Sequence, residues 1–138
     1  MESRTTLGFR AGLETVLLLE FAGRKSGRAL STPISYHVDE QGAHCFTTRS
    51  FGWWRNLLSG DAVILTIRGE RWRSTPQVET SDHVLMGERL AAFLSAVPRD
   101  APHAGVRLDD EGHPNREDIR RVVPDMVYLR FTLGASPL

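Results

Sequence analysis

Short β-forming segments separated by turn signals run through most of the sequence, and they constrain the fold more than any other feature. Residues Val16 to Phe21 form an apolar run closed by a glycine, and its length suits a buried strand better than a helix. The turn signals at residues 39–42 and at Gly69-Glu70 predict hairpins between the segments that flank them. Hairpin connections favour antiparallel pairing, so roughly five or six strands predict an antiparallel barrel with helices added to it.

The expected elements follow from this pattern. We expect strands over Thr15–Phe21, Leu30–Val38, Ala43–Thr48, Ala62–Arg68, Arg71–Glu79 and Met126–Leu133. We expect helices over Trp53–Leu58, from a cap at Ser81 to a stop before Pro98, and over Asn115–Val123. Residues 98–116 are polar and proline-rich and predict a long loop. The fold class is therefore mainly β with helices (α+β), in one domain over residues 1–138, with residues 1–14 expected to be a flexible or helical segment.

Composition excludes several classes of protein. The chain has 138 residues, 17 Lys and Arg against 17 Asp and Glu, and a mean hydropathy of -0.26. Nucleic-acid binders need an excess of cations to displace counterions, so we expect no nucleic-acid partner. The apolar runs fall far short of the roughly twenty residues that cross a bilayer, so we expect no integral membrane segment. The single cysteine, Cys45, and the absence of a signal-peptide pattern predict a reduced, cytoplasmic setting.

A cationic run bounded by glycines, Gly23-Arg24-Lys25-Ser26-Gly27-Arg28, follows the first expected strand. Residues 21–73 carry eight Arg and Lys against four Asp and Glu, and Lys25 is the only lysine of the chain. Glycine allows a tight turn and a close approach of a ligand, while guanidinium, ammonium and backbone N–H groups bind phosphate or carboxylate. The spacing is not that of a P-loop. From spacing alone, a solvated basic turn is the more common explanation of such a run.

An aromatic cluster follows at Phe51-Gly52-Trp53-Trp54-Arg55-Asn56-Leu57. A planar ligand could lie on such a surface while Arg55 and Asn56 meet its carbonyl or phosphate groups. Taken singly, either tryptophan is better explained as a core residue that packs into the end of the barrel than as a ligand-binding residue. The hairpin over residues 30–48 is expected to bring this cluster and the cationic run to one rim.

Other reactive side chains give weaker signals. Of the five histidines, only His37 and His44 are expected to face each other, across the first hairpin. Two imidazoles without a third ligand make a poor metal site, so we expect no metal. Cys45 is most simply a small apolar strand residue, and the acidic run at residues 109–111 a solvated loop.

The ordered set of motifs resembles the deazaflavin (F420)-dependent nitroreductase family, within the split β-barrel flavin and deazaflavin oxidoreductases. The residues that carry the resemblance are Gly23 to Gly27 with Thr32-Pro33, then Gly52 to Leu57, Arg68 to Trp72, and Asp125 to Arg130. The match keeps the family's order over roughly residues 15–133 of the chain. It implies a split β-barrel of the FMN-binding-like type that binds coenzyme F420 and uses its reduced form to deliver hydride.

The same resemblance assigns roles to individual residues. It implies that Arg24, Lys25, Ser26 and Gly27 hold the phosphate and acidic tail of the cofactor. It places Thr32, Pro33, Thr47, Thr48, Trp53, Arg55 and Asn56 beside the cofactor. The acceptor is expected to be a small organic molecule, such as a quinone, a nitro compound or an activated double bond. Tyr36 and Tyr128 are weak side-chain candidates for the proton donor, with solvent as an alternative.

Three matters stay open at the level of sequence. An FMN-dependent reductase or oxidase on the same barrel would also use a basic loop for its phosphate. A non-catalytic carrier of a cofactor or ligand would keep the scaffold without turnover. The substrate pocket is expected to involve residues 98–116 and the amino-terminal residues, and split barrels often pair through a sheet face, which favours a homodimer.

Overall fold

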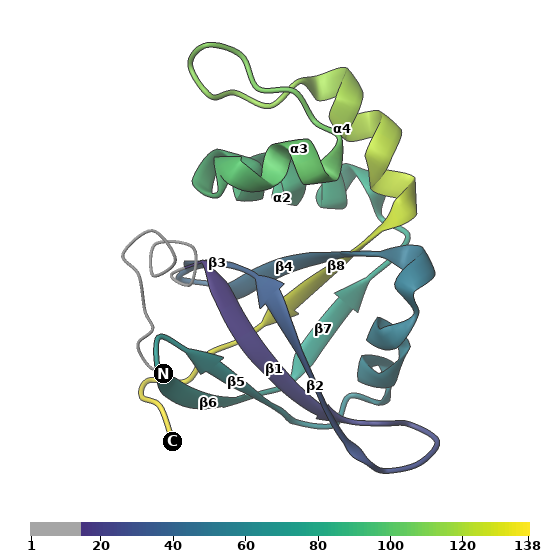
Figure 1. Cartoon of the computed structure of the whole chain (residues 1–138), viewed down its shortest axis with the longest axis vertical. Helices are drawn as coiled ribbons and strands as arrows, with labels where there is room; N and C mark the ends of the chain where they lie inside the picture. The colour runs from purple at the N-terminus through teal and green to yellow at the C-terminus, as the bar shows by residue number, and fades with distance from the viewer. Residues whose placement is uncertain (1–14) are drawn as a thin grey trace, which may run out of the picture.

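A computed structural model describes residues 15–138 of the chain. Two four-stranded antiparallel sheets form a barrel, and a layer of helices covers one of them (Figure 1). The prediction for residues 1–14 lies outside the described residues. The predicted class, mainly β with helices in a single domain, is confirmed.

The first sheet is built from β1 (Val16–Ala22), β2 (Ala29–Ser35), β5 (Val63–Ile67) and β6 (Glu70–Ser74), in the order β2-β1-β5-β6. The second is built from β3 (His37–Asp39), β4 (Gly42–Thr48), β7 (Pro76–Glu79) and β8 (Met126–Phe131), in the order β3-β4-β8-β7. β1 pairs with β2 along its whole length, from Val16 opposite Ser35 to Ala22 opposite Ala29.

The predicted hairpin over residues 30–48 is wrong in its first arm. β2 pairs with β1 in the first sheet, and only the short β3 pairs with β4 across the turn at residues 39–42. The chain changes sheets at Tyr36, whose backbone N–H donates to the carbonyl of Thr15. The alternation of residue types predicted strands correctly here, but alternation does not specify which neighbour a strand pairs with.

The segment over residues 71–79 also divides between the sheets. β6 pairs with β5 as predicted, whereas β7 begins at Pro76 and pairs with β8. Proline lacks the N–H that continued pairing would need, so the strand breaks where Pro76 stands. The predicted strand over residues 71–79 is therefore two strands, β6 in the first sheet and β7 in the second.

The helices fall close to their predicted positions, with some differences at their ends. They are η1 (Arg49–Phe51), η2 (Trp53–Ser59), α2 (His83–Ala96), η3 (Pro98–Asp100), α3 (Ala101–Ala104), α4 (Arg116–Val122) and η4 (Val123–Asp125). The cap of α2 is Asp82, whose carboxylate accepts from the N–H of Leu85, and not Ser81. The predicted loop over residues 98–116 contains η3 and α3.

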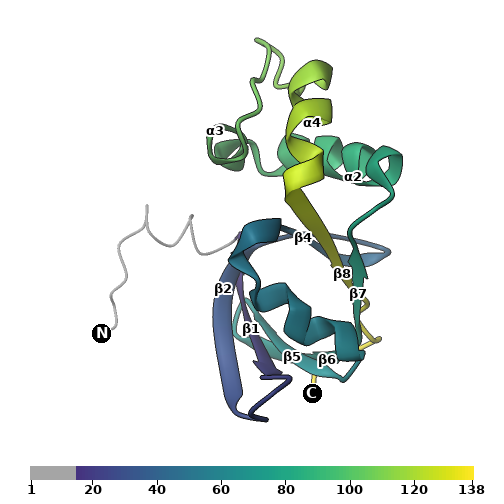
Figure 2. The ribbon, with the colours of Figure 1, turned by 90° about the vertical axis from the view of Figure 1, so that its right-hand side faces the viewer.

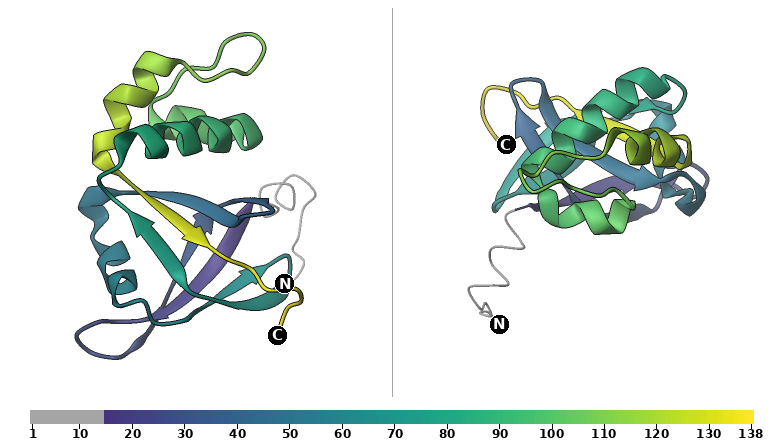
Figure 3. Two further views of the ribbon diagram at one scale, coloured as in Figure 1. Left: turned by 180° about the vertical axis from the view of Figure 1, so that it is seen from behind. Right: turned by 90° about the horizontal axis from the view of Figure 1, so that it is seen from above.

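The helices α2, α3 and α4 lie over the outer face of the second sheet, with α2 running across it (Figures 1, 2 and 3). Contacts such as that between Phe46 of β4 and Phe93 of α2, whose rings lie 5.8 Å apart, join the two layers. None of the described helices is both long and apolar enough to span a bilayer.

Two apolar clusters support these layers. One fills the barrel and includes Leu19, Leu65 and Phe131, which are fully buried. Cys45 lies in the same cluster, and burial raises the pKa of its thiol. The other cluster lies between the second sheet and the helices, around Met86 and Leu94. β8 separates the two clusters, because alternate residues of a strand point to opposite faces of the sheet.

Candidate functional site

A cavity with a mixed polar and apolar lining lies between the β2 edge of the barrel and the helical layer. Its volume is about 560 Å³, within the range of ligand pockets. β2 and β4 supply one wall, η2 another, and α2 with the segment after it a third. We call this the main cavity. Its lining includes Thr32, Pro33, Phe46, Thr47, Thr48, Trp53, Leu90, Phe93, Arg99, Asp100 and His103.

Five of the residues assigned by the resemblance meet in the main cavity. They come from three separate elements and are Thr32, Pro33, Thr47, Thr48 and Trp53. Thr47 is 9% exposed and sits at the end of β4, whereas Thr48 is exposed. The Trp53 ring packs against the ring of Phe21 of β1, with the ring centres 5.8 Å apart. Together these residues offer an aromatic surface and hydroxyl groups to a planar ligand.

The cationic loop between β1 and β2, residues 23–28, is exposed and tightly folded. Its ends are joined by the Gly23 N–H, which donates to the carbonyl of Arg28 over 2.8 Å. The Ser26 hydroxyl accepts from the Arg28 N–H over 3.1 Å, so this side chain helps to close the turn. Gly27 has a φ of +70°, a conformation that glycine adopts at little cost. The charged ends of Arg24 and Lys25 are left on an exposed surface.

Asn56 of η2 connects the loop to the helix beside the main cavity. Its side-chain oxygen accepts from the Arg24 N–H over 2.8 Å, and its amide donates to the Trp53 carbonyl over 2.8 Å. The predicted approach of the aromatic cluster to the cationic run is confirmed, although η2 provides it and not the hairpin over residues 30–48. Figure 2 shows η2 running down the side of the barrel from the helical end, between β2 and β7.

The Arg55 side chain has a different place from the one expected. Its guanidinium carbon lies 4.6 Å from the centre of the Trp54 ring, a cation–π contact. Trp54 is buried, and its indole N–H donates to the Arg49 carbonyl. Neither Arg55 nor Trp54 lines the main cavity, so this pair supports the position of η2.

The two tyrosines also lie elsewhere. Tyr36 lines a separate cavity of about 450 Å³, and among residues 15–138 its buried hydroxyl has no hydrogen-bond partner. Tyr128 is 4% exposed, and its hydroxyl is bonded to Nδ1 of His44. Neither tyrosine lines the main cavity, so the geometry gives no support to a role as proton donor there.

Sequence reasoning missed several residues of the main cavity. Phe46 and Phe93 form part of its apolar wall, and Asp100 and His103 bring titratable groups to it. The proline-rich segment 98–116 was expected to contribute to a pocket, and its first residues do so. No local pattern marks His103, because it reaches the cavity only when the segment after α2 folds back over the sheet.

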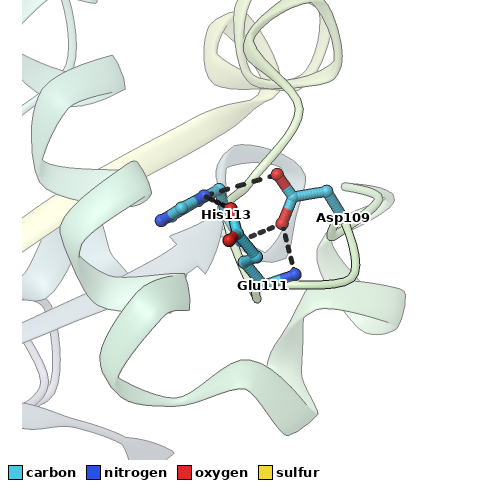
Figure 4. A group of neighbouring side chains, drawn as sticks. All are labelled: Asp109, Glu111 and His113. Atoms are coloured by element: carbon cyan, nitrogen blue, oxygen red, sulfur yellow. Dashed lines mark hydrogen bonds and ion pairs between the residues drawn. The ribbon is translucent and has the colours of Figure 1, made fainter.

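An exposed cluster in the α3–α4 loop brings Asp109, Glu111 and His113 together, with one ligand-type atom of each within 4.8 Å of the others (Figure 4). Hydrogen bonds within the loop account for the arrangement, since Asp109 Oδ1 accepts from the N–H groups of Glu111 and His113. These hydrogen bonds also lower the pKa of the Asp109 carboxyl, although partial burial opposes them. The cluster therefore closes a loop, as the predicted solvated run implies.

Comparison with known proteins identifies the fold. No family model and no curated protein matches the chain. A putative 5-nitroimidazole antibiotic resistance protein from Bacteroides thetaiotaomicron has a TM-score of 0.60 and 9% identity, covering 97% of this chain and 81% of that one. A pyridoxamine 5'-phosphate oxidase-related, FMN-binding protein from Nostoc punctiforme has a TM-score of 0.57 and 13% identity, covering 92% and 79%.

A third structure, the protein Atu2129 of unknown function from Agrobacterium tumefaciens, has a TM-score of 0.60 and 13% identity. The alignment covers 97% of this chain but only 57% of that one, so this chain spans little more than half of its length. The similarity in these structures lies in the fold, since identity is low throughout. The predicted split β-barrel of the FMN-binding-like type is thereby confirmed.

Proposed function

We propose that the protein is an F420H2-dependent oxidoreductase, which transfers hydride from the reduced deazaflavin to a small organic acceptor. The observation that carries the proposal is the hydrogen bond from the Arg24 N–H to Asn56. It links an exposed cationic loop to η2, the helix that places Trp53 in the main cavity. A long ligand with a planar ring at one end and several acidic groups at the other fits this layout.

The residues present fit such a cofactor. The main cavity has room for a planar ring, with the side chain of Trp53 and the hydroxyls of Thr47 and Thr48 in its wall. The charged groups of Arg24 and Lys25 lie outside the cavity, where they can meet the phosphate and carboxylates of a tail. When bound, the reduced deazaflavin would supply the hydride, and the barrel would orient the ring toward an acceptor.

A proton must also reach the reduced acceptor. Among the described residues of the main cavity, His103 and Asp100 carry an imidazole and a carboxyl group, which are side chains able to serve as general acids. His103 is exposed, so it can exchange its proton with solvent. We therefore propose His103 for this step, in place of the tyrosines.

Titration of the protein with reduced F420, followed by fluorescence and by oxidation on addition of a quinone or nitroarene, tests the proposal. We expect micromolar binding, and we expect the double variant Arg24→Gln/Lys25→Gln to weaken it at least tenfold. The matched control is Arg73→Gln/Arg120→Gln, which removes two exposed arginines elsewhere and should leave affinity unchanged. Failure to bind, or equal binding by both double variants, would overturn the proposal.

FMN is the second candidate cofactor, because a structural neighbour is FMN-binding. Anaerobic titrations with FMN and with F420 in parallel distinguish the two. Tighter binding of FMN would transfer the proposal to a flavin-dependent reductase or oxidase on the same barrel. Stoichiometric binding of F420 without oxidation by any acceptor would favour a carrier. Light scattering of the same samples tests the expected homodimer.

A further inference from the structure

Three side chains on the outer face of the second sheet form a continuous hydrogen-bonded chain. Nε2 of His44 lies 2.7 Å from Oδ1 of Asp39, and Nδ1 of His44 lies 2.6 Å from the Tyr128 hydroxyl. His44 is 3% exposed and Tyr128 is 4% exposed. The pairing of β3 with β4 and of β4 with β8 brings the three residues together, although His44 and Tyr128 are 84 residues apart. We call this chain the relay.

The direction of the hydrogen bonds in the relay follows from Asp39. Partial burial alone would raise the pKa of its carboxyl, but the hydrogen bonds from His44 and from the Gln41 N–H outweigh burial and lower it. An ionised carboxylate can only accept, so Nε2 of His44 must donate to it. In neutral His44 the other nitrogen, Nδ1, then carries a lone pair. The Tyr128 hydroxyl donates its proton to that lone pair.

Protonation of His44 reverses the second hydrogen bond. Both ring nitrogens of an imidazolium donate, so Nδ1 would donate to the Tyr128 oxygen. The phenolic proton would then be free to point away from His44. When His44 is neutral, the Tyr128 hydroxyl donates to it and can only accept from a second partner. When His44 is protonated, the hydroxyl accepts from it and can donate to a second partner.

Tyr128 also lines a small pocket between α2 and strands β7 and β8, with a volume of about 250 Å³. We call it the relay pocket. Arg89 of α2 and Arg130 of β8 line it as well, and the Arg89 side chain makes no hydrogen bond or ion pair within residues 15–138. Arg130 donates to the carbonyl of Gln41 and to the side-chain oxygen of Gln77, which holds its guanidinium in place.

The charged groups around His44 and the relay pocket come from every neighbouring element. Asp39 and His37 belong to β3, and the His37 ring stacks on His44 at 5.9 Å between centres. Arg130 lies opposite His44 on β8, and Arg89 belongs to α2. Glu79 of β7 also lines the pocket, but its carboxylate accepts from the N–H groups of Ser81 and Asp82 at the start of α2. Two guanidinium groups therefore face one carboxylate that is already engaged.

We propose that the relay pocket binds a small oxyanion, and that binding is coupled to the uptake of one proton by His44. Arg89 and Arg130 supply the positive charge, and Tyr128 supplies a hydrogen bond only when His44 is protonated. The site is distinct from the main cavity and does not depend on the cofactor proposed there. Its ligand is a phosphate, sulfate or carboxylate group, free or at the end of a small molecule.

Sulfate is the appropriate probe, because its charge does not change between neutral and mildly acidic pH. Isothermal titration at constant ionic strength would be run on the variant Arg24→Gln/Lys25→Gln, so that the cationic loop contributes no binding. If binding takes up one proton, the affinity should rise as the pH falls from neutral to mildly acidic, approaching about tenfold per pH unit. Repeating the titration in two buffers of different ionisation enthalpy should show uptake of close to one proton.

Three variants, made in the same background, separate the parts of the proposal. Tyr128→Phe should weaken sulfate binding at acidic pH and remove most of its pH dependence. Arg89→Gln should weaken binding at every pH and keep the dependence. His37→Gln, which leaves the relay intact, should keep both.

Several results would overturn the proposal. Binding whose affinity does not change with pH would refute the coupling, and binding unchanged in Arg89→Gln would refute the pocket. Absence of sulfate binding at millimolar concentrations in folded protein, verified by circular dichroism, would refute the site itself. Loss of pH dependence in His37→Gln would assign the proton to His37 instead.

Discussion

The main cavity and the relay pocket both lie under α2, but their polar groups are held in different ways. Leu90 and Phe93 of α2 line the main cavity, and Leu85 and Arg89 line the relay pocket. In the main cavity the polar side chains come from β2, the end of β4 and the short helices η3 and α3, and the proposed cationic anchor is an exposed turn outside it. Beside the relay pocket, the buried His44 and Tyr128 and the exposed Asp39 hold one another by hydrogen bonds on the face of the second sheet.

This difference bears on what each site can do. Side chains on loops can adapt to a large ligand, and loops carry binding function because a rigid scaffold positions them. A buried hydrogen-bonded network has few alternative arrangements, and loss of one member leaves the others unsatisfied. Substitutions should therefore affect ligand binding more than stability near the main cavity, and both properties in the relay.

The most damaging change should be the loss of a large apolar side chain from the barrel core. Phe131 of β8 is fully buried in the barrel. Phe131→Ala should lower the free energy of unfolding by about 3–5 kcal/mol, because it removes a large apolar side chain and leaves a cavity. Urea denaturation measures this, with Val84→Ala, at a position 76% exposed, as the control. A loss similar to that of the control would contradict the assigned core.

His44→Leu tests the relay alone. It removes the partner of the buried Tyr128 hydroxyl, which should lower the free energy of unfolding by about 1–3 kcal/mol. The double variant His44→Leu/Tyr128→Phe should be no less stable than His44→Leu, because the orphaned hydroxyl is then gone. Denaturation of the four proteins of this cycle gives the coupling energy. Strict additivity would show that the two side chains act independently.

Asn56→Ala tests the link between the cationic loop and η2. Loss of the hydrogen bonds to Arg24 and Trp53 should cost about 0.5–1.5 kcal/mol of stability. It should also weaken cofactor binding, since the loop would no longer be held beside η2. Asn56→Asp is the comparison variant, because it keeps an oxygen that accepts from the Arg24 N–H but loses the amide that donates to the Trp53 carbonyl. Equal cofactor affinity in the alanine variant and the wild type would argue against the link.

Asp118 of α4 offers a comparison outside both pockets. Hydrogen bonds from the Arg107 side chain and N–H, and then from the Arg121 side chain, lower the pKa of its carboxyl. Because the pKa is lower in the folded state, the stabilisation is fully present above the unfolded pKa and is lost as the pH falls toward the folded one. Asp118→Asn should therefore reduce the melting temperature at neutral pH, and the difference should shrink below about pH 4. A constant difference at all pH values would contradict this assignment.

The smallest effect on stability is expected from the loop cations themselves. Arg24→Gln/Lys25→Gln changes two exposed side chains, so the free energy of unfolding should stay within about 0.5 kcal/mol of the wild type. Cofactor affinity should nevertheless fall. Thermal denaturation without ligand, beside the binding titration, separates the two effects. A large loss of stability would show that these side chains support the fold and not a ligand.

Sequence reasoning was most successful where a local pattern determines a local structure. The helix predicted over Trp53–Leu58 ends before Gly60 as η2, and the helix predicted over Asn115–Val123 forms as α4 with its next turn. The predicted contact of His37 with His44 also holds, because the turn at residues 39–42 fixes their register. These features depend only on residues close together in the chain.

Pairing between distant segments could not be predicted in the same way. The segment Leu30–Val38 was expected to be one arm of a hairpin with Ala43–Thr48, yet β2 covers most of it and pairs with β1. Tyr128 was expected to act at the cofactor site, and it lies instead against a histidine that precedes it by 84 residues. In the candidate site, the resemblance supplied the cavity residues on β2, β4 and η2. It supplied nothing for His103, whose place depends on how the segment after α2 folds back.

The burial of Cys45 makes the rate at which its thiol is modified a measure of ligand binding. It is the only thiol of the chain and is fully buried in the barrel, so a thiol reagent can modify it only after the barrel opens. The rate of modification therefore reports the population of open molecules when reclosing is fast. Any ligand that binds the closed form should slow modification by the factor by which it stabilises that form. Cofactors, acceptors and oxyanions can thus be compared on one scale, without an assay of turnover.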